Sequence, residues 1–304
     1  MTSGAGLPAE LGQAREHFLQ LVGELRPGLH RYCARLVGSV VDGEDIVQDA
    51  LAKAFYALSM ASESPPLRPW LFRIAHNTAI DFLRRHEQAR VERRADFEDT
   101  AAEPEDAVDP SVVRASLSSF LELPVRQRSA VILKDVLGHS LAEVADTMGA
   151  TIPAVKAALV RGRAALRAQS PAEARPRAAV DPVERGRLDR YVAAFNARDW
   201  DGLRSLMSEE CRLELVSRAV RRGAGVREYV SRYAAGSQLR MAVGAVEGRP
   251  ALLVFRAGES RPDYFILIDW SGDRVSFIRD YRYAGYVAAE AELELELEPS
   301  PERA

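Results

Sequence analysis

The chain has 304 residues, of which 47% are hydrophobic and 28% charged, and its formal net charge is −3. This length and composition predict two or three domains with buried cores. No apolar stretch reaches the roughly 20 residues of a membrane-spanning helix, and the first residues lack the pattern of a signal peptide. Cys33 and Cys211 fit no metal-binding spacing. We therefore expect a cytoplasmic protein without a disulfide, metal, cofactor or membrane contact.

Charge is distributed unevenly along the chain. Residues 68–94 and 111–170 each carry a net charge of +4, whereas residues 95–113 carry −7 and residues 288–304 carry −5. Two basic segments separated by an acidic one predict a nucleic-acid-binding protein with two spaced contacts.

Residues 11–94 are expected to be helical, because apolar residues recur there at helical spacing. The two sets are Phe18, Leu21, Val22 and Leu25, and then Ile46, Val47, Ala50, Leu51 and Phe55. Asp42–Gly43 predicts a turn, residues 62–66 a loop, and residues 69–85 a further helix. Residues 95–110 are acidic and poor in apolar side chains, so we expect a flexible linker.

Residues 111–169 form a second predicted helical module, which contains a helix-turn-helix pattern. Ser140 and Glu143 form a capping box, S-x-x-E, at the start of its first helix. Gly149 permits the tight turn, and Thr151 can cap the second helix. The second helix carries several cations and no carboxylate. This charge pattern is typical of a helix that enters the major groove of DNA.

We expect the second helix to present a face of small and cationic residues to DNA. The expected contacts are Thr151, Ala154, Lys156, Ala157, Val160, Arg161 and Arg163. The residues expected to face the core are Ile152, Val155, Leu159 and Leu166. Small residues let the backbone approach the groove, and the cations bind phosphates or guanine edges. The alternative is a solvated amphipathic helix in an ordinary helical bundle.

The chain changes character after a second predicted linker at residues 170–182. Residues 183–287 begin with two helical patterns, the second ending at Met207, and continue with segments of β-strand character. These segments are 211–216, 238–246, 251–256, 264–270 and 274–282. We expect an α+β domain with helices packed against a curved antiparallel sheet. Residues 288–304 form an acidic tail of low complexity, either disordered or pairing as an edge strand.

Three segments resemble the second and fourth conserved regions of bacterial sigma factors, and the best match is the small extracytoplasmic-function group. Residues 42–56 contain D-x-x-Q-D, and residues 67–85 contain W-L-x-x-I-A-x-N-x-x-x-D-x-x-R. Residues 123–167 open with L-P-x-x-x-R and close with R-x-R-x-x-L-R. The resemblance implies two all-α domains, region 2 over residues 11–94 and region 4 over residues 111–169.

The resemblance also implies partners for each region. In this family, region 2 binds core RNA polymerase and the −10 promoter element, and region 4 binds the −35 element. Asp45, Gln48 and Asp49 lie on one helical face, which the resemblance assigns to the polymerase, although spacing alone favours a solvated acidic face. Aromatic and cationic side chains suit an unpaired strand. The residues expected at the −10 element are Arg68, Arg73, His76, Asn77 and Arg84.

Residues 183–287 resemble the SnoaL-like, or polyketide-cyclase-like, cone-shaped α+β fold, which some sigma factors carry. The resemblance implies a regulatory role, exerted through a small-molecule ligand or an intramolecular contact. Enzymes of this fold use an inward Asp or His, but the segment contains no His. Its candidate acids, Glu214, Asp269 and Asp280, are expected at the surface or in ion pairs. We therefore expect no enzymatic activity.

These features predict a sigma factor that binds core RNA polymerase and promoter DNA, directs transcription initiation and is modulated by its C-terminal domain. One alternative is a conventional helix-turn-helix regulator with a ligand-binding domain, which leaves the motif at residues 45–49 and the segment around Trp70 unexplained. Another is a cyclase or isomerase tethered to DNA, which lacks a recognisable acid/base pair. We also expect the acidic tail to screen the basic recognition helix in the free protein.

Overall fold

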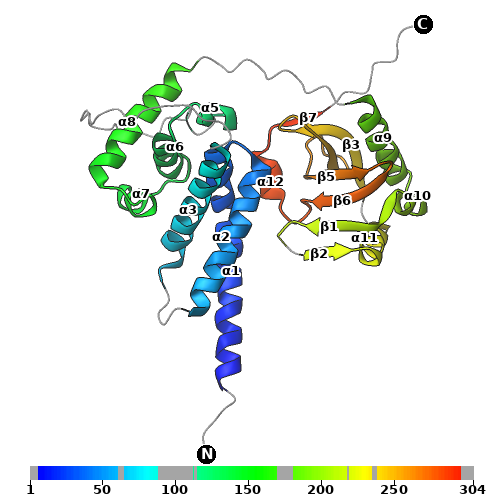
Figure 1. Ribbon diagram of the computed structural model, residues 1–304, viewed down its shortest axis with the longest axis horizontal. Helices are drawn as coiled ribbons and strands as arrows, with labels where there is room; N and C mark the ends of the chain where they lie inside the picture. Colours follow the sequence, from blue (N-terminus) through cyan, green and yellow to red (C-terminus); the bar gives the residue numbers. More distant parts are fainter. Residues whose placement is uncertain are drawn as a thin grey trace, which may run out of the picture. The chain divides into compact units, whose positions relative to one another are not determined.

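The computed structural model describes residues 6–60, 65–87, 112, 115–169, 181–217, 219–234 and 238–295. The chain divides into two compact units, with the boundary between Glu173 and Ala174. Both are drawn in Figure 1. The expected linker at residues 95–110 and most of the one at residues 170–182 lie outside the described residues. Among the described helices, none is both long and apolar enough to cross a membrane.

The first unit begins with three long helices, α1 (Gly6–Val37), α2 (Val40–Met60) and α3 (Leu67–Glu87). The expected turn at Asp42–Gly43 is wrong, because α2 continues through these residues. The chain turns instead at Gly38, whose φ of +80° favours glycine. Gly43 has a packing role: a Cβ there would lie 2.7 Å from the backbone of Ala34. Glycine therefore allows α1 and α2 to approach closely.

The second part of this unit consists of shorter helices. These are α5 (Leu117–Leu121), α6 (Val125–Val131), the π-helix η1 (Ile132–Val136), α7 (Leu141–Met148) and α8 (Ile152–Ala168). The expected capping box is confirmed, since the Ser140 hydroxyl accepts from the Glu143 backbone and the Glu143 carboxylate accepts from the Ser140 backbone. Gly149 adopts a φ of +60°, and Thr151 caps α8. These local signals define the helix-turn-helix.

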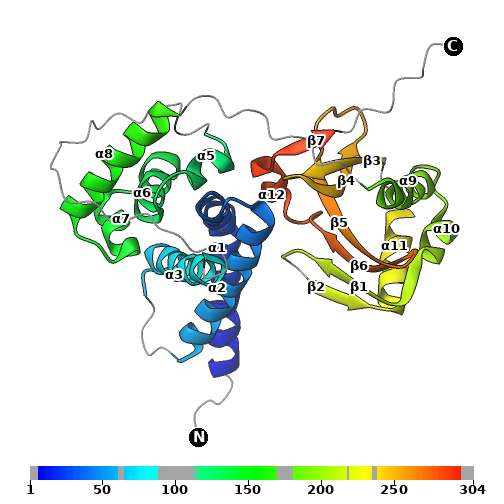
Figure 2. The same ribbon diagram turned by 45° about the horizontal axis from the view of Figure 1, so that its top comes forward.

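Both sets of helices in the first unit pack around one hydrophobic core. Leu36 at the end of α1 and Phe120 in α5 are both fully buried in it. The Arg128 guanidinium of α6 donates to the backbone carbonyl of Leu36, and also to those of Leu121 (3.0 Å) and Leu123 (2.9 Å). Figure 2 and Figure 1 both show α3 beside α7, and the two helices are in contact. The two helical parts therefore form one body.

The second unit is an α+β fold built on one curved sheet. Its strands run in the order β2-β1-β6-β5-β4-β3-β7. They are β1 (Met207–Leu215), β2 (Ala219–Arg222), β3 (Leu239–Val246), β4 (Arg249–Arg256), β5 (Tyr264–Ser271), β6 (Arg274–Asp280) and β7 (Leu293–Leu295). Neighbouring strands are antiparallel except β1 and β6, which are parallel. The expected fold class is confirmed, but Met207 begins a strand instead of ending a helix.

Helices cover one side of this sheet. Figure 2 shows α9 (Pro182–Asn196), α10 (Trp200–Ser205) and α11 (Ala224–Ala234) on the same side of the curved strands. The curved strands and these helices enclose an apolar interior that includes Phe195, Leu213 and Ile266. This arrangement is what creates the pocket described below.

The edge-strand alternative for the acidic tail is confirmed at its start. Residues 288–295 belong to the fold, because α12 (Gly285–Glu290) and β7 continue the chain along the edge of the sheet. Leu293 pairs with Val246 and Leu295 with Gly244. The alternation of leucine and glutamate suits a strand, and a Cβ on Gly244 would lie 2.5 Å from the Glu294 carbonyl oxygen. Glycine in β3 therefore permits β7 to pair.

Candidate nucleic-acid interface and C-terminal pocket

The exposed face of α8 carries most of the residues expected to read DNA. Thr151, Ala154 and Lys156 are exposed, and Val160 and Arg161 are partly buried. The helix begins at a capped N-terminus and contains no carboxylate. Its free backbone N–H groups and its cations favour phosphate oxygens. The first three turns of α8 thus have the chemistry of a DNA-reading helix.

Two residues of the expected set do not lie on this face. Arg163 is 5% exposed, and its Nε and Nη2 atoms bond the Asp135 carboxylate at 2.9 and 2.6 Å. Ala157 is also buried. Both side chains were expected to project outward, and that expectation is wrong because this side of α8 packs against the rest of the helical body. Ile152, which was expected in the core, is 43% exposed.

The buried Arg163–Asp135 pair fixes the recognition helix. The carboxylate belongs to η1 and is fully buried, so the pair joins α8 to η1 through two parallel hydrogen bonds. Because a bidentate pair constrains distance and direction together, it sets the angle at which the exposed face of α8 is presented.

The α3 residues expected at the −10 element separate into exposed and buried groups. Arg68, Asn77 and Arg84 are exposed, and Arg73 is half-exposed with an ion pair to Asp146 of α7 at 3.3 Å. His76 is buried, so its expected contact with DNA is wrong. Its Nδ1 atom is hydrogen-bonded to the Tyr32 hydroxyl at 2.6 Å, and burial lowers the pKa of His76 to about 4. The residue is therefore a neutral part of the core.

A shallow hollow lies beside these residues, between α2 and α3. It is lined by Lys53, Asp81, Arg84 and Arg85. The Lys53 ammonium group donates to the Thr78 hydroxyl at 3.1 Å, which fixes its position. Sequence reasoning missed Lys53 and Arg85. Lys53 gave no signal, because only the packing of α2 on α3 places it next to residues of the later helix.

One face of α2 combines acidic and aromatic residues. Asp45 and Gln48 are partly buried and Asp49 is exposed, as expected for one helical face. Farther along the same helix, Phe55 is 51% and Tyr56 is 67% exposed. Phe55 was expected in the core, but the neighbouring Ala54 is buried instead. An exposed aromatic pair next to acidic residues is typical of a protein-binding surface.

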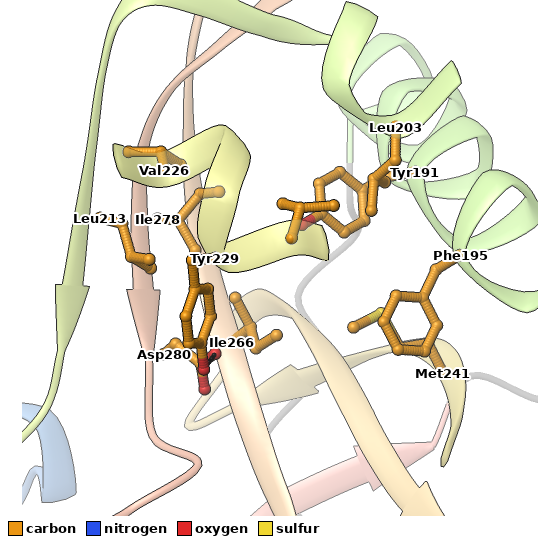
Figure 3. A pocket seen from close by; sticks show the side chains of 11 residues that line it. Tyr191, Phe195, Leu203, Leu213, Val226, Tyr229, Met241, Ile266, Ile278 and Asp280 are labelled. Carbon is orange, nitrogen blue, oxygen red and sulfur yellow. Dashed lines mark hydrogen bonds between the residues drawn. The ribbon is translucent and has the colours of Figure 1, made fainter. Parts of the chain in front are cut away.

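The second unit contains an apolar pocket with three polar groups (Figure 3). Asp280 is 1% exposed. Its carboxylate accepts from the Tyr229 hydroxyl at 3.1 Å and from the Arg282 backbone N–H at 2.8 Å. Tyr191 also lines the pocket, and burial raises the pKa of its hydroxyl, with a further rise from the charge of Asp280. The cavity of about 10 Å³ holds about one water molecule.

The three acids considered in the sequence have different surroundings. Glu214 pairs with Arg279 at 3.3 Å, and Asp269 is exposed. Asp280 does not lie at the surface, which was one of its two expected environments, because β6 ends with its side chain turned into the pocket. Within the described parts of the chain, His, Cys, Asp and Glu side chains form no cluster suited to a metal ion.

Comparisons with known proteins identify the family. Residues 21–89 match Sigma-70 region 2, and residues 118–166 match Sigma-70, region 4. The chain is 31% identical over 288 residues to the ECF RNA polymerase sigma factor SigG of Mycobacterium tuberculosis, covering 83% of this chain and 78% of SigG. It belongs to the extracytoplasmic-function sigma factors. This sigma factor therefore binds core RNA polymerase and directs promoter-specific transcription initiation.

Other relatives match different parts of this sigma factor. SigW of Bacillus subtilis is 29% identical over 167 residues, which cover 51% of this chain and 89% of SigW. The crystal structure of SigJ from M. tuberculosis covers 88% of this chain and 98% of its own, at 22% identity and a TM-score of 0.35. The SigG match extends into the C-terminal unit, which has an α+β architecture.

Proposed function

We propose that the exposed face of α8 reads the −35 element through Thr151, Ala154, Lys156, Val160 and Arg161. The observation that supports this most strongly is the capped, acid-free N-terminal half of α8, which presents Lys156 and small side chains on its exposed side. Ala157 and Arg163 take no part in this contact, because both are buried.

The same reasoning assigns region 2. Arg68, Arg73, Asn77 and Arg84 of α3 contact the −10 element, and the cations of the neighbouring hollow hold the phosphates of the unpaired strand. Asp45, Gln48 and Asp49 bind core RNA polymerase through the exposed face of α2, which Phe55 and Tyr56 extend. Since these partners act in the bacterial cytoplasm, we place the protein there.

Replacing Lys156 by alanine should weaken binding to a −35 duplex several-fold and lower the slope of log K against log salt by about 1, because one phosphate contact is lost. The measurement is fluorescence anisotropy over a salt series with the full chain, using the upstream region of its own gene. Arg126→Ala removes an exposed cation of α6 and should leave both quantities unchanged. Equal effects of the two substitutions would show that α8 is not the reading helix.

The C-terminal unit acts as a regulator in this proposal, not as an enzyme. Its pocket holds about one water molecule, too little for an organic substrate in this state, and the unit contains no His. Asp280 and the two tyrosines provide hydrogen-bonding groups for a small ligand that enters when the pocket widens. The regulatory assignment would be contradicted if the unmodified chain turned over any substrate and Asp280→Asn abolished that turnover.

The acidic residues after β7 restrain the free protein by screening the cations of α8. Replacing Glu296, Glu298 and Glu302 by glutamine should therefore raise transcription in vitro with core polymerase, most clearly at low salt, where charges act over longer distances. A control with the same charge change uses the exposed residues Glu209, Glu210 and Glu259. Equal transcription from both triple variants and the unmodified chain would remove the tail from the mechanism.

A further inference from the structure

The −10-reading helix and the helix-turn-helix are in direct contact within the first unit. The ring of Phe72 in α3 packs edge-to-face on His139, which precedes α7, with the ring centroids 4.6 Å apart. Arg73 of α3 pairs with Asp146 of α7 at 3.3 Å. We call these two pairs the α3–α7 contact.

This contact is incompatible with binding both promoter elements at once. The elements are centred about 25 base pairs apart, which corresponds to about 80 Å of duplex. Two packed helices have axes about 8–10 Å apart. Moreover, the ion pair with Asp146 competes with DNA for the Arg73 guanidinium. The two readers must therefore separate before a promoter is bound.

His139 destabilises the contact in which it takes part. Its side chain is 3% exposed, and neither ring nitrogen has a hydrogen-bond partner among the residues that the structure describes. A buried polar group without a hydrogen-bond partner destabilises the closed arrangement, and water supplies the missing partner once the group is exposed. Separation of α3 from α7 therefore relieves a cost that the closed arrangement carries.

Charged groups face His139 from both helices. Arg68 of α3 opposes its protonation, and Glu143 of α7 favours it. Burial is the largest influence, so the pKa of His139 lies below its ordinary value in the closed arrangement. A proton consequently binds the imidazole more tightly once the contact opens.

We propose that the α3–α7 contact is an autoinhibitory latch, released when His139 takes up a proton. Release frees Arg73 and removes one of the contacts that hold the two promoter readers together. The hydrogen bond from Arg128 of α6 to the Leu36 carbonyl of α1 is another, and it must also break for the readers to separate. The contact of the freed Arg73 with the −10 element rests on the proposed function. The opening of the α3–α7 contact does not depend on it.

The direction of the pH dependence follows from the lowered pKa. The latch has its full stability above the ordinary His pKa of about 6.5, and it loses stability as the pH falls below that value. His76 has a pKa of about 4, so it stays largely neutral between about pH 6.5 and about pH 5.5.

Opening can be measured in the full chain by energy transfer between two dyes. Ala57→Cys on α2 and Ala164→Cys on α8 place the dyes at exposed positions, whereas the native Cys33 and Cys211 are buried and react slowly. Between about pH 8 and pH 5.5, we expect the ratio of open to closed chains to rise about tenfold, the full effect of one histidine over this range.

Two substitutions at His139 separate protonation from other effects. His139→Phe keeps an aromatic ring without a titrating group and should stay closed at both pH values. His139→Lys introduces a permanent cation and should already be open at the higher pH, with helix content checked by circular dichroism. His86→Phe, at an exposed histidine stacked on Phe82, should keep the full pH response.

Two results would overturn the latch. One is energy transfer in the unmodified chain that does not change with pH, and the other is a His139→Phe chain that responds as strongly as the unmodified one. Because the measurement uses neither DNA nor polymerase, either result leaves the proposed reading of the −10 element intact. Conversely, normal promoter melting by an Arg73→Ala chain would contradict only that assignment.

Discussion

Replacing Arg163 by alanine should lower the free energy of unfolding of the first unit by about 3–5 kcal/mol. The reason is that Asp135 is fully buried and loses the guanidinium that bonds both of its oxygens. The variant also loses the two bonds that join α8 to η1, so −35 binding should fall along with stability. Urea unfolding followed by circular dichroism measures the first effect, and anisotropy with duplex DNA the second.

A nearby arginine provides the control for this substitution. Arg167, one turn later on α8, is exposed, and Arg167→Ala should change the unfolding free energy by less than about 1 kcal/mol. In the double variant Asp135→Leu with Arg163→Met, no buried charge remains, so most of the stability should return. If Arg163→Ala unfolds at the same urea concentration as the unmodified chain, the pair does not stabilise the helix-turn-helix.

Introducing a single methyl group at Gly43 should destabilise region 2 by about 1–3 kcal/mol, the usual cost of overpacking. The Cβ of Gly43→Ala would lie 2.7 Å from backbone atoms of Ala34, and backbone cannot move aside as a side chain can. The helices α1 and α2 must therefore shift apart. Because α2 carries Asp45 and Gln48, binding to core polymerase should weaken as well.

Gly23 offers a matched comparison in α1. A Cβ at this position meets no atom within 4 Å, so Gly23→Ala should raise stability by up to about 1 kcal/mol through helix propensity alone. Thermal unfolding of both variants tests whether Gly43→Ala lowers the melting temperature and Gly23→Ala raises it. A Gly43→Ala chain that melts at a higher temperature than the unmodified protein would show that α1 and α2 do not need the close approach.

Signals that act within a few residues were sufficient to predict the helix-turn-helix. The capping box of Ser140 and Glu143, the left-handed Gly149 and the cap at Thr151 all appear in the structure. Each depends on hydrogen bonds or backbone angles that neighbouring residues determine. The strands β3, β4, β5 and β6 could be predicted for the same reason.

Features that depend on distant partners were not predictable. Arg163 appeared to be a DNA contact, because its partner Asp135 lies 28 residues earlier in a different helix. Asp280 appeared to be a surface acid, because only the curvature of the sheet turns it toward Tyr229. An edge strand in the tail was one of two alternatives, but its partner was not predictable, because the pairing of β7 with β3 depends on Gly244, far from the tail in sequence. In each case, tertiary packing decided the environment.

In the closed arrangement, the two helical halves of the first unit fit each other through specific side chains. Arg128, at the start of the helix-turn-helix region, donates to the carbonyl of Leu36 at the end of α1. A Cβ on Gly38 would overlap the Leu121 side chain. A chimera that takes its −35 reader from another sigma factor must therefore preserve an arginine, a leucine and a glycine across the joint. Exchange of promoter specificity among relatives is then constrained by the complementarity of the two halves as well as by their separate DNA contacts.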